Sequence, residues 1–185
     1  GFLNTSVINT RITPPKELSN IISRKAVNGL LRANINKKLI LITAPAGYGK
    51  TSAVIEYVYN GIGPFAWLHI NKDIVTIFQL FNYMIFALRR LKSEFGEDLL
   101  NTISQLSEDS AGILNIESVT NELTGIFVNE FIMTFNEQTI LVLDDLHEIL
   151  HNNWYKYFFE KLIQEAPENL QLVITTRHLL ELNLS

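Results

Sequence analysis

Residues 38–59 read KLILITAPAGYGKTSAVIEYVY, and the rest of the chain is arranged around this stretch. The segment 39–43 is a short, β-branched apolar run, which is typical of a strand buried on both faces. A turn of small residues follows at 44–49, and residues 52–59 favour a helix. The order of strand, small-residue turn, Gly-Lys-Thr and helix predicts a phosphate-binding loop.

The residues of this turn suit the binding of a triphosphate. Gly47 and Gly49 allow the backbone to curl so that several N–H groups point inward, and the helix that follows adds its unpaired N–H groups and positive dipole end. Lys50 is expected to reach the β- and γ-phosphates, and the hydroxyl of Thr51 to bind Mg²⁺. The one departure is Ala44, which stands where the usual pattern begins with Gly. The predicted nucleotide-binding residues of the loop and helix are Ala46, Gly47, Tyr48, Gly49, Lys50, Thr51 and Ser52.

Composition narrows the class of protein. A chain of 185 residues with 47% hydrophobic residues fits one domain with a real core. The net charge of -4 argues against a nucleic-acid surface, so we expect no direct DNA binding by this segment. The absence of cysteine excludes disulfides and thiolate metal sites and fits a reducing, cytoplasmic location. No apolar run is long enough for a membrane span, so no membrane partner is expected.

Strands and helices alternate along the chain. Further buried strands are expected at 65–70, 139–143 and 170–175, and helices are expected around 22–31, 77–88, 99–106, 116–127 and 154–162. Residues 1–20 are expected to be irregular, because Pro14-Pro15 stops a helix there. We therefore predict an α/β fold: a three-layer αβα P-loop NTPase domain with a mainly parallel sheet, truncated after the fourth core strand. Residues 1–37 would form a lead segment with a helix and residues 38–185 the NTPase core.

Paired carboxylates follow the strand expected at 139–143. Asp144 is the candidate ligand of Mg²⁺, and Asp145 could orient the attacking water or accept its proton. A strand end often carries Asp simply as a turn residue, which is the alternative interpretation. The upstream phosphate-binding loop favours the metal-binding role.

A third set of polar residues follows the strand expected at 170–175. Arg177 is the candidate γ-phosphate sensor, assisted by Thr175 or Thr176, and the alternative is an ordinary surface arginine. Ligands of parallel sheets lie beyond the carboxyl ends of the strands. Lys50, Asp144 and Arg177 are therefore expected to converge at one edge of the sheet.

His147-Glu148-Ile149-Leu150-His151 matches the zinc-peptidase pattern H-E-x-x-H, which needs both imidazoles on one helical face. The flanking residues disagree with that interpretation, because aspartates precede and asparagines follow the motif. No third zinc ligand is evident either, so we expect no zinc peptidase.

Together these motifs resemble the MalT-like (maltose-regulon activator, LuxR-type) family, within the signal-transduction ATPases with numerous domains. The similar segments are Pro-Ala-Gly-Tyr-Gly-Lys-Thr at 45–51, Ala66-Trp67-Leu68, Asp144-Asp145-Leu146-His147, and Pro167-Glu168-Asn169-Leu170 leading to Thr175-Thr176-Arg177. Upstream, Ile22-Ser23-Arg24 looks like a family segment that contacts adenine, which implies such contacts for Ile22 and Arg24. The chain departs from the family at Asn71, where Asp is common, although Asp73 is near.

The resemblance implies an ATP-driven switch in a bacterial transcriptional regulator that uses ATP/ADP and Mg²⁺. Such proteins rest with ADP, self-associate after binding ATP and an inducer, and hydrolyse ATP slowly. We expect weak turnover from this segment by itself, because a switch needs other domains to close upon. The alternatives are a generic AAA+-type ATPase and a nucleotide-binding interaction module without turnover. A metabolic kinase is disfavoured, because no arginine-rich lid follows the third strand.

Overall fold

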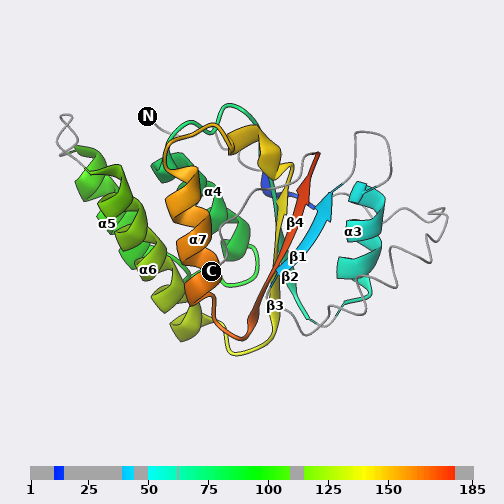
Figure 1. The fold of residues 1–185 in the computed structure, drawn as a ribbon. Helices are drawn as coiled ribbons and strands as arrows, with labels where there is room; N and C mark the ends of the chain where they lie inside the picture. The colour runs from blue at the N-terminus through cyan, green and yellow to red at the C-terminus, as the bar shows by residue number, and fades with distance from the viewer. Residues whose placement is uncertain (1–10, 15–38, 44–49, 62, 109–114, 178–185) are drawn as a thin grey trace.

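The computed structural model describes residues 11–14, 39–43, 50–61, 63–108 and 115–177 (Figure 1). Its elements, in chain order, are β1 (Leu39–Thr43), α3 (Lys50–Tyr59), β2 (Phe65–His69), α4 (Ile77–Arg89), α5 (Glu97–Glu108), α6 (Ile116–Thr134), β3 (Thr139–Asp144), the 3-10 helix η1 (Leu146–Ile149), α7 (Tyr155–Glu165) and β4 (Leu170–Thr176). The alternation of strands and helices that the sequence predicts is therefore confirmed.

The four strands form one parallel sheet in the order β1-β4-β3-β2. The last of the described strands, β4, lies between β1 and β3, so the two strands that carry the predicted phosphate and metal motifs are not adjacent. Because every strand runs in the same direction, all four carboxyl ends meet at one edge of the sheet. This edge is where ligands bind in open α/β sheets.

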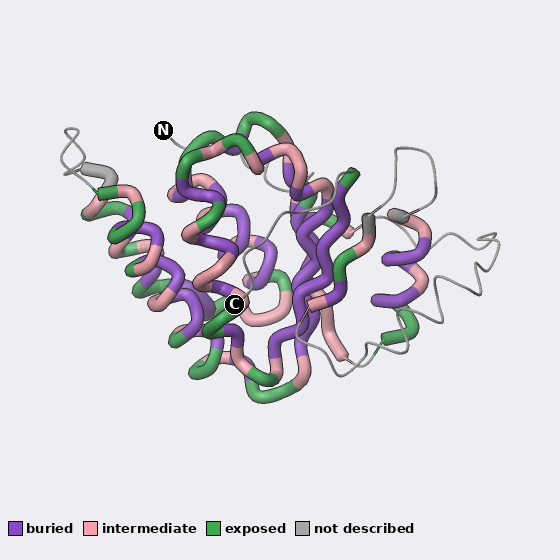
Figure 2. Tube along the Cα trace, in the orientation of Figure 1, coloured by how far each residue is buried: buried purple, intermediate pink, exposed green. Residues whose placement is uncertain are grey.

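Helices cover both faces of the sheet (Figure 1). On one face α3 packs through Val54 and Val58 against Trp67, Val142 and Val173 of the strands. On the other face α4 and α7 lie next to the sheet, with α5 and α6 further out. The alternate strand residues, among them Leu68, Leu143 and Ile174, belong to that second core. Both faces of β3 and β4 are buried (Figure 2), which explains their continuous apolar sequences and confirms the three-layer αβα fold class.

The helix ends follow local sequence signals. The side chain of Thr76 accepts a hydrogen bond from the backbone of Gln79, and the Gln79 side chain accepts one from the backbone of Thr76, so a capping box begins α4. Asn115 caps α6, because its Oδ1 accepts a hydrogen bond from the backbone of Ser118. Helix α6 continues to Thr134, beyond the expected range, because its apolar face extends through Phe131 in the core.

The expectation that residues 1–20 are irregular is wrong for the part that the structure describes. Arg11 and Ile12 are helical, and Ile12 belongs to the same core as α4 and α6. The guanidinium of Arg11 lies over the ring of Tyr83, 4.8 Å from its centroid, and donates a hydrogen bond to the Tyr83 hydroxyl. A single apolar residue in a polar segment is a weak signal, which is why the sequence did not indicate this contact. The helix expected at 22–31 lies outside the described residues.

Candidate functional site

One row of side chains crosses the sheet close to its carboxyl edge. In the register of the sheet, Ile42 of β1 pairs with Thr175 of β4, and His69 of β2 pairs with Asp144 of β3. Leu143 of β3 pairs with Ile174 of β4, so the next residues along these two strands, Asp144 and Thr175, are also neighbours. Successive strand residues point to opposite faces. Thr175, Asp144 and His69 therefore share the face of Val173, Val142 and Trp67, against which α3 packs.

Asp144 is the centre of this row. Its side chain is only 7% exposed. Its Oδ1 accepts a hydrogen bond of 2.5 Å from the Thr175 hydroxyl, and its Oδ2 lies 3.0 Å from Nδ1 of His69. A buried carboxylate needs such partners, because burial alone would strongly disfavour its charge. Neighbouring strands thus fix both oxygens of Asp144.

Asp145 begins the turn that leaves β3. Its φ of 61° and ψ of 45° place it in the left-handed region, which non-glycine residues seldom adopt and which Asp tolerates better than most. Its backbone N–H donates a hydrogen bond of 2.9 Å to the Thr175 hydroxyl. Its carboxylate lies beside the row, with Oδ2 3.7 Å from Nδ1 of His69. The same threonine therefore holds both consecutive aspartates.

His69 completes a compact group with the two aspartates. One ligand atom from each of His69, Asp144 and Asp145 lies within 4.8 Å of the others. The hydrogen bond to Asp144 raises the pKa of His69; burial opposes this shift, and the charges of both carboxylates reinforce it. Without a bound cation, a proton on His69 would offset the negative charge of the aspartates.

Sequence reasoning missed His69. The strand Ala66-Trp67-Leu68-His69 ends in a histidine, but its place beside Asp144 follows only from the pairing of β2 with β3. A signal was present in principle, since a polar residue follows a buried run there as it does at Asp144.

The loops next to this edge are tied together. The side chain of Asn152 donates a hydrogen bond of 3.2 Å to the carbonyl of Ile74, and Nε1 of Trp154 donates one of 3.0 Å to the carbonyl of Val75. These bonds join the segment after η1 to the segment before α4. They keep the outgoing ends of β2 and β3 side by side.

The predicted phosphate-binding residues are only partly described. Six of the predicted residues lie outside the described residues: Ile22, Arg24, Ala46, Gly47, Tyr48 and Gly49. Helix α3 begins at Lys50, and Thr51 and Ser52 are half-buried in its first turn. Helix α3 covers the face of the sheet toward which Asp144 and Thr175 point, and Lys50 and Thr51 lie in its first turn.

Arg177 directly follows β4 and has an exposed side chain. Its backbone N–H donates a hydrogen bond of 3.2 Å to Nδ1 of His147. The parallel sheet brings Arg177 and Asp144 to the same edge, as the sequence predicts. Thr175, expected to assist Arg177, bonds to Asp144.

The H-E-x-x-H motif does not have the geometry of a zinc site. His147 lies in η1, which is a 3-10 helix, and His151 follows in an exposed turn. Three residues per turn do not place positions four apart on one face. The Nε2 of His147 instead lies 3.2 Å from Oε1 of Glu148.

Asp73, near the departure from the family at Asn71, has a different partner. Its Oδ2 lies 3.3 Å from the guanidinium of Arg11, and its backbone N–H donates a hydrogen bond to Oδ1 of Asn71. Both residues therefore stabilise the segment after β2. The group of His69, Asp144 and Asp145 does not include them.

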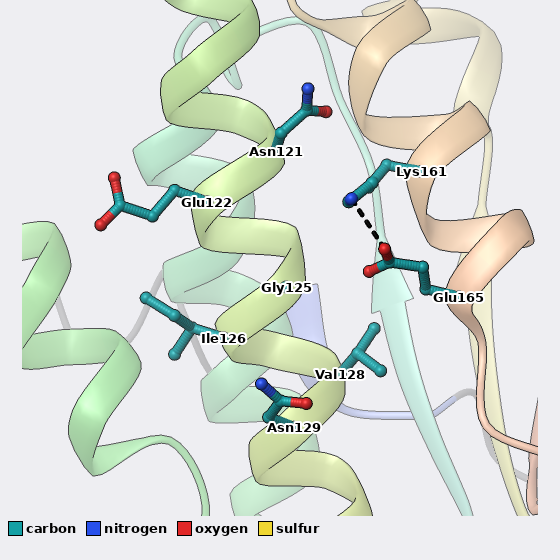
Figure 3. Close-up of a pocket in the computed structure, with 8 residues that line it drawn as sticks. All are labelled: Asn121, Glu122, Gly125, Ile126, Val128, Asn129, Lys161 and Glu165. Carbon is teal, nitrogen blue, oxygen red and sulfur yellow. Dashed lines mark ion pairs between the residues drawn. The ribbon is translucent and has the colours of Figure 1, made fainter.

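A separate hollow of about 640 Å³ lies between α6 and α7 (Figure 3). It is lined by Asn121, Glu122, Gly125, Ile126, Val128, Asn129, Lys161 and Glu165. Lys161 and Glu165 form an ion pair with a separation of 2.7 Å across its α7 side. No strand residue lines this hollow, so it is distinct from the carboxyl edge.

The parallel sheet, its polar edge and the helix that begins with Lys-Thr match the three-layer arrangement expected of a P-loop domain. In sequence the chain is similar to HTH-type transcriptional regulators named MalT. It is 28% identical over 176 residues to that of Vibrio parahaemolyticus and 25% identical over 170 residues to that of Vibrio cholerae. Both matches cover 92% of this chain, which spans 18% of the length of these relatives. The resemblance seen in the motifs is thus confirmed as sequence similarity. No protein-family model matches the chain.

Solved structures are more distantly similar. A chain of the Drosophila ORC bound to AT-rich DNA and Cdc6 superimposes with a TM-score of 0.44 at 14% identity, covering 84% of this chain and 50% of that one. The C. elegans PCH-2 structure gives a TM-score of 0.36 at 12% identity, covering 86% of this chain and 37% of that one. Neither likeness is close enough to indicate function. Among the described helices, none has the length and apolar character needed to cross a membrane.

Proposed function

We propose that the chain is the ATP-binding switch domain of a bacterial transcriptional regulator of the MalT type. The observation that carries this proposal is the row of Thr175, Asp144 and His69 at the carboxyl edge, which points to the face covered by α3. Helix α3 begins at Lys50, directly after the glycines of the sequence motif. Similarity to MalT regulators over 92% of the chain supports the regulatory role.

The donor groups at this edge suit a nucleotide with its magnesium ion. Asp144 and Thr51 would hold Mg²⁺, since hard cations prefer carboxylate and hydroxyl oxygens. Bound magnesium would offset the charge of the phosphates. Asp145 would orient the attacking water or accept its proton, and Arg177 would sense the γ-phosphate.

The remaining contacts come from residues near the phosphates and the base. Lys50 would bring a full positive charge to the phosphates, and the backbone of Ala46, Gly47, Tyr48 and Gly49 would cradle them, with Ser52 next to them. Ile22 and Arg24 would contact adenine. The lead segment 1–37 would thus provide the adenine side of the site, and the core 38–185 the phosphate side.

The proposed switch has two states, one with ADP bound and one with ATP bound. ADP would hold the regulator at rest, and ATP would favour self-association of the full-length protein. Moving a two-state equilibrium from 1% to 99% active takes about 5.5 kcal/mol of differential binding. We expect this segment by itself to hydrolyse ATP slowly, as befits a switch.

Nucleotide binding is the first test. Fluorescent ADP and ATP analogues are titrated with magnesium into the unchanged protein and into Lys50→Ala. Each charge-assisted hydrogen bond contributes about 1.5–3 kcal/mol, so the variant should lose roughly 10- to 150-fold in affinity. Lys156→Ala, which removes an exposed lysine from α7 beyond the opposite face of the sheet, is the matched control and should bind normally. Equal affinity of Lys50→Ala and the unchanged protein would overturn the proposal.

Turnover and assembly provide the second test. Phosphate release should stay far below one per second with this segment, and brisk steady-state hydrolysis would contradict a switch. The full-length protein should form larger assemblies with ATP than with ADP, as measured by size-exclusion chromatography with light scattering. Identical assembly in both nucleotides would exclude the proposed control of self-association.

A further inference from the structure

The proposed metal-binding edge contains a nitrogen atom where oxygen ligands alone would suffice for magnesium. Nδ1 of His69 lies 3.0 Å from Oδ2 of Asp144 and 3.7 Å from Oδ2 of Asp145. We propose that His69 is a direct ligand of the cation at this site, and that the site therefore prefers Mn²⁺ to Mg²⁺. This inference rests on the proposed function, since it takes Asp144 as a metal-binding residue of that same site.

The distances suit one ion bound by His69 and Asp144, with Asp145 close beside it. Two ligands at right angles, each about 2.1 Å from an ion, are about 3.0 Å apart. The separation of 3.0 Å between His69 and Asp144 matches this value. Oδ2 of Asp145, on a side chain that is 19% exposed, lies 3.7 Å from Nδ1 of His69, where it can position a water molecule next to the ion. A cation could enter from solvent, because the side chain of His69 is 46% exposed.

The surroundings hold the ligand atoms in place. Asp144 keeps Oδ1 bonded to the Thr175 hydroxyl, so Oδ2 is the oxygen that faces His69. The backbone of His69 is fixed by its pairing with β3. In the tautomer with the proton on Nε2, Nδ1 offers a lone pair to a metal. A ligand held by a second group is the usual construction of metal sites in proteins.

The chemistry of the ligand set determines the preferred ion. Magnesium binds oxygen ligands and retains several waters, whereas imidazole nitrogen favours transition-metal ions. Carboxylates bind Mg²⁺, Ca²⁺ and Mn²⁺ well, and Mn²⁺ is the transition-metal ion of these three, so an imidazole beside the carboxylate favours Mn²⁺ over Mg²⁺. Phosphate oxygens of a nucleotide could occupy the remaining positions without displacing the histidine.

The decisive experiment detects the nitrogen itself. Mn²⁺ is added as the probe, first by itself and then with an ATP analogue, and electron spin echo modulation is recorded. The protein is prepared once with ordinary histidine and once with ¹⁵N-histidine. Nitrogen coupling that changes with the isotope is expected. Its absence in both conditions would overturn the inference, whether or not Mn²⁺ binds through the carboxylates.

Variants assign the nitrogen to one histidine. His69→Gln should abolish the coupling and lower Mn²⁺ affinity by at least about tenfold, with a much smaller effect on Mg²⁺ affinity. His151→Gln is the matched control, because it removes an exposed histidine outside the group. Circular dichroism checks that both variants fold. If His69→Gln does not fold, the isotope comparison on the unchanged protein still shows whether a histidine nitrogen binds the metal. Coupling retained in His69→Gln would assign the metal to another residue and refute the proposal.

The results separate this inference from the proposed function. Binding of fluorescent ADP with magnesium, without nitrogen coupling, would support the proposed function and refute the histidine ligand. Isotope-sensitive coupling without nucleotide binding would support the metal site and refute the proposed function.

Discussion

The hydroxyl of Thr175 in β4 lies 2.5 Å from Oδ1 of Asp144 in β3. The hydroxyl oxygen of Thr175 also accepts a hydrogen bond of 2.9 Å from the backbone N–H of Asp145. One side chain on the neighbouring strand therefore positions both proposed functional carboxylates. This arrangement depends on β4 lying next to β3.

Replacing Thr175 with valine tests this role. The nearly isosteric Thr175→Val removes the donor to buried Asp144 and the acceptor for Asp145. We expect a loss of about 1–3 kcal/mol in the free energy of unfolding. Magnesium-dependent nucleotide affinity should fall as well. Urea denaturation and nucleotide titration measure the two effects, and Thr175→Ser, which keeps the hydroxyl, should resemble the unchanged protein. Identical behaviour of the valine and serine variants would contradict this role.

Glu130 gives a prediction about pH. Its carboxylate in α6 accepts hydrogen bonds from the backbone N–H groups of Gly96 (2.9 Å) and Leu99 (2.5 Å) at the start of α5. Burial raises the pKa of Glu130, although both N–H groups oppose the shift. The folded state then binds the proton more tightly than the unfolded state. The resulting contribution to stability is present below the unfolded pKa and is lost as pH rises through the folded pKa.

Glu130→Gln should remove this dependence. The free energy of unfolding of the variant, minus that of the unchanged protein, should increase as pH rises from about 4 through the folded pKa. Urea midpoints at several pH values measure the difference. Glu122→Gln, at an exposed position of the same helix, serves as the control and should show less change. A difference that stays constant with pH would exclude the raised pKa.

Gly125 is a site where substitution should stabilise the fold. It lies inside α6 at the hollow beside α7, and a Cβ placed there meets no atom within 4 Å. Glycine in a helix costs about 0.5–1 kcal/mol relative to alanine. Gly125→Ala should therefore raise the unfolding free energy by about that amount, as measured by urea denaturation. A decrease would show that α6 needs this glycine for a contact.

Gly63 should respond in the opposite way. A Cβ at this position, just before β2, would lie 2.1 Å from the carbonyl oxygen of Gln138, which precedes β3. Because that atom belongs to the backbone, β2 and β3 would have to move apart locally. Gly63→Ala should lower the unfolding free energy by about 1–3 kcal/mol. Equal stability of the variant and the unchanged protein in denaturant titration would refute the close approach.

Much of the fold could be predicted because its local signals are strong. β3 and β4 are largely apolar runs because both of their faces are buried, and α4 shows the helical period with a capping box at Thr76. The prediction that 39–43 is buried on both faces is wrong, because β1 lies at the edge of the described sheet and Leu41 is 38% exposed. Asn115 caps α6, as is common for a short polar side chain directly before an apolar helix.

The strand order could not be predicted in the same way. Buried parallel strands have similar apolar sequences, so nothing local states that β4 lies between β1 and β3. The contacts of Asp144 with Thr175 and His69 depend on that order. The sequence predicted Asp144 itself from its motif but not the histidine beside it.

The place of β4 in the sheet has a consequence for biosynthesis. Strand β1 pairs with β4, which the ribosome makes after the other described elements. At about 5–20 residues per second, the apolar β1 waits roughly ten seconds for this neighbour. Until β4 is synthesised, the edge of β1 that pairs with it has no partner strand, and the contacts of Thr175 with Asp144 and Asp145 cannot form.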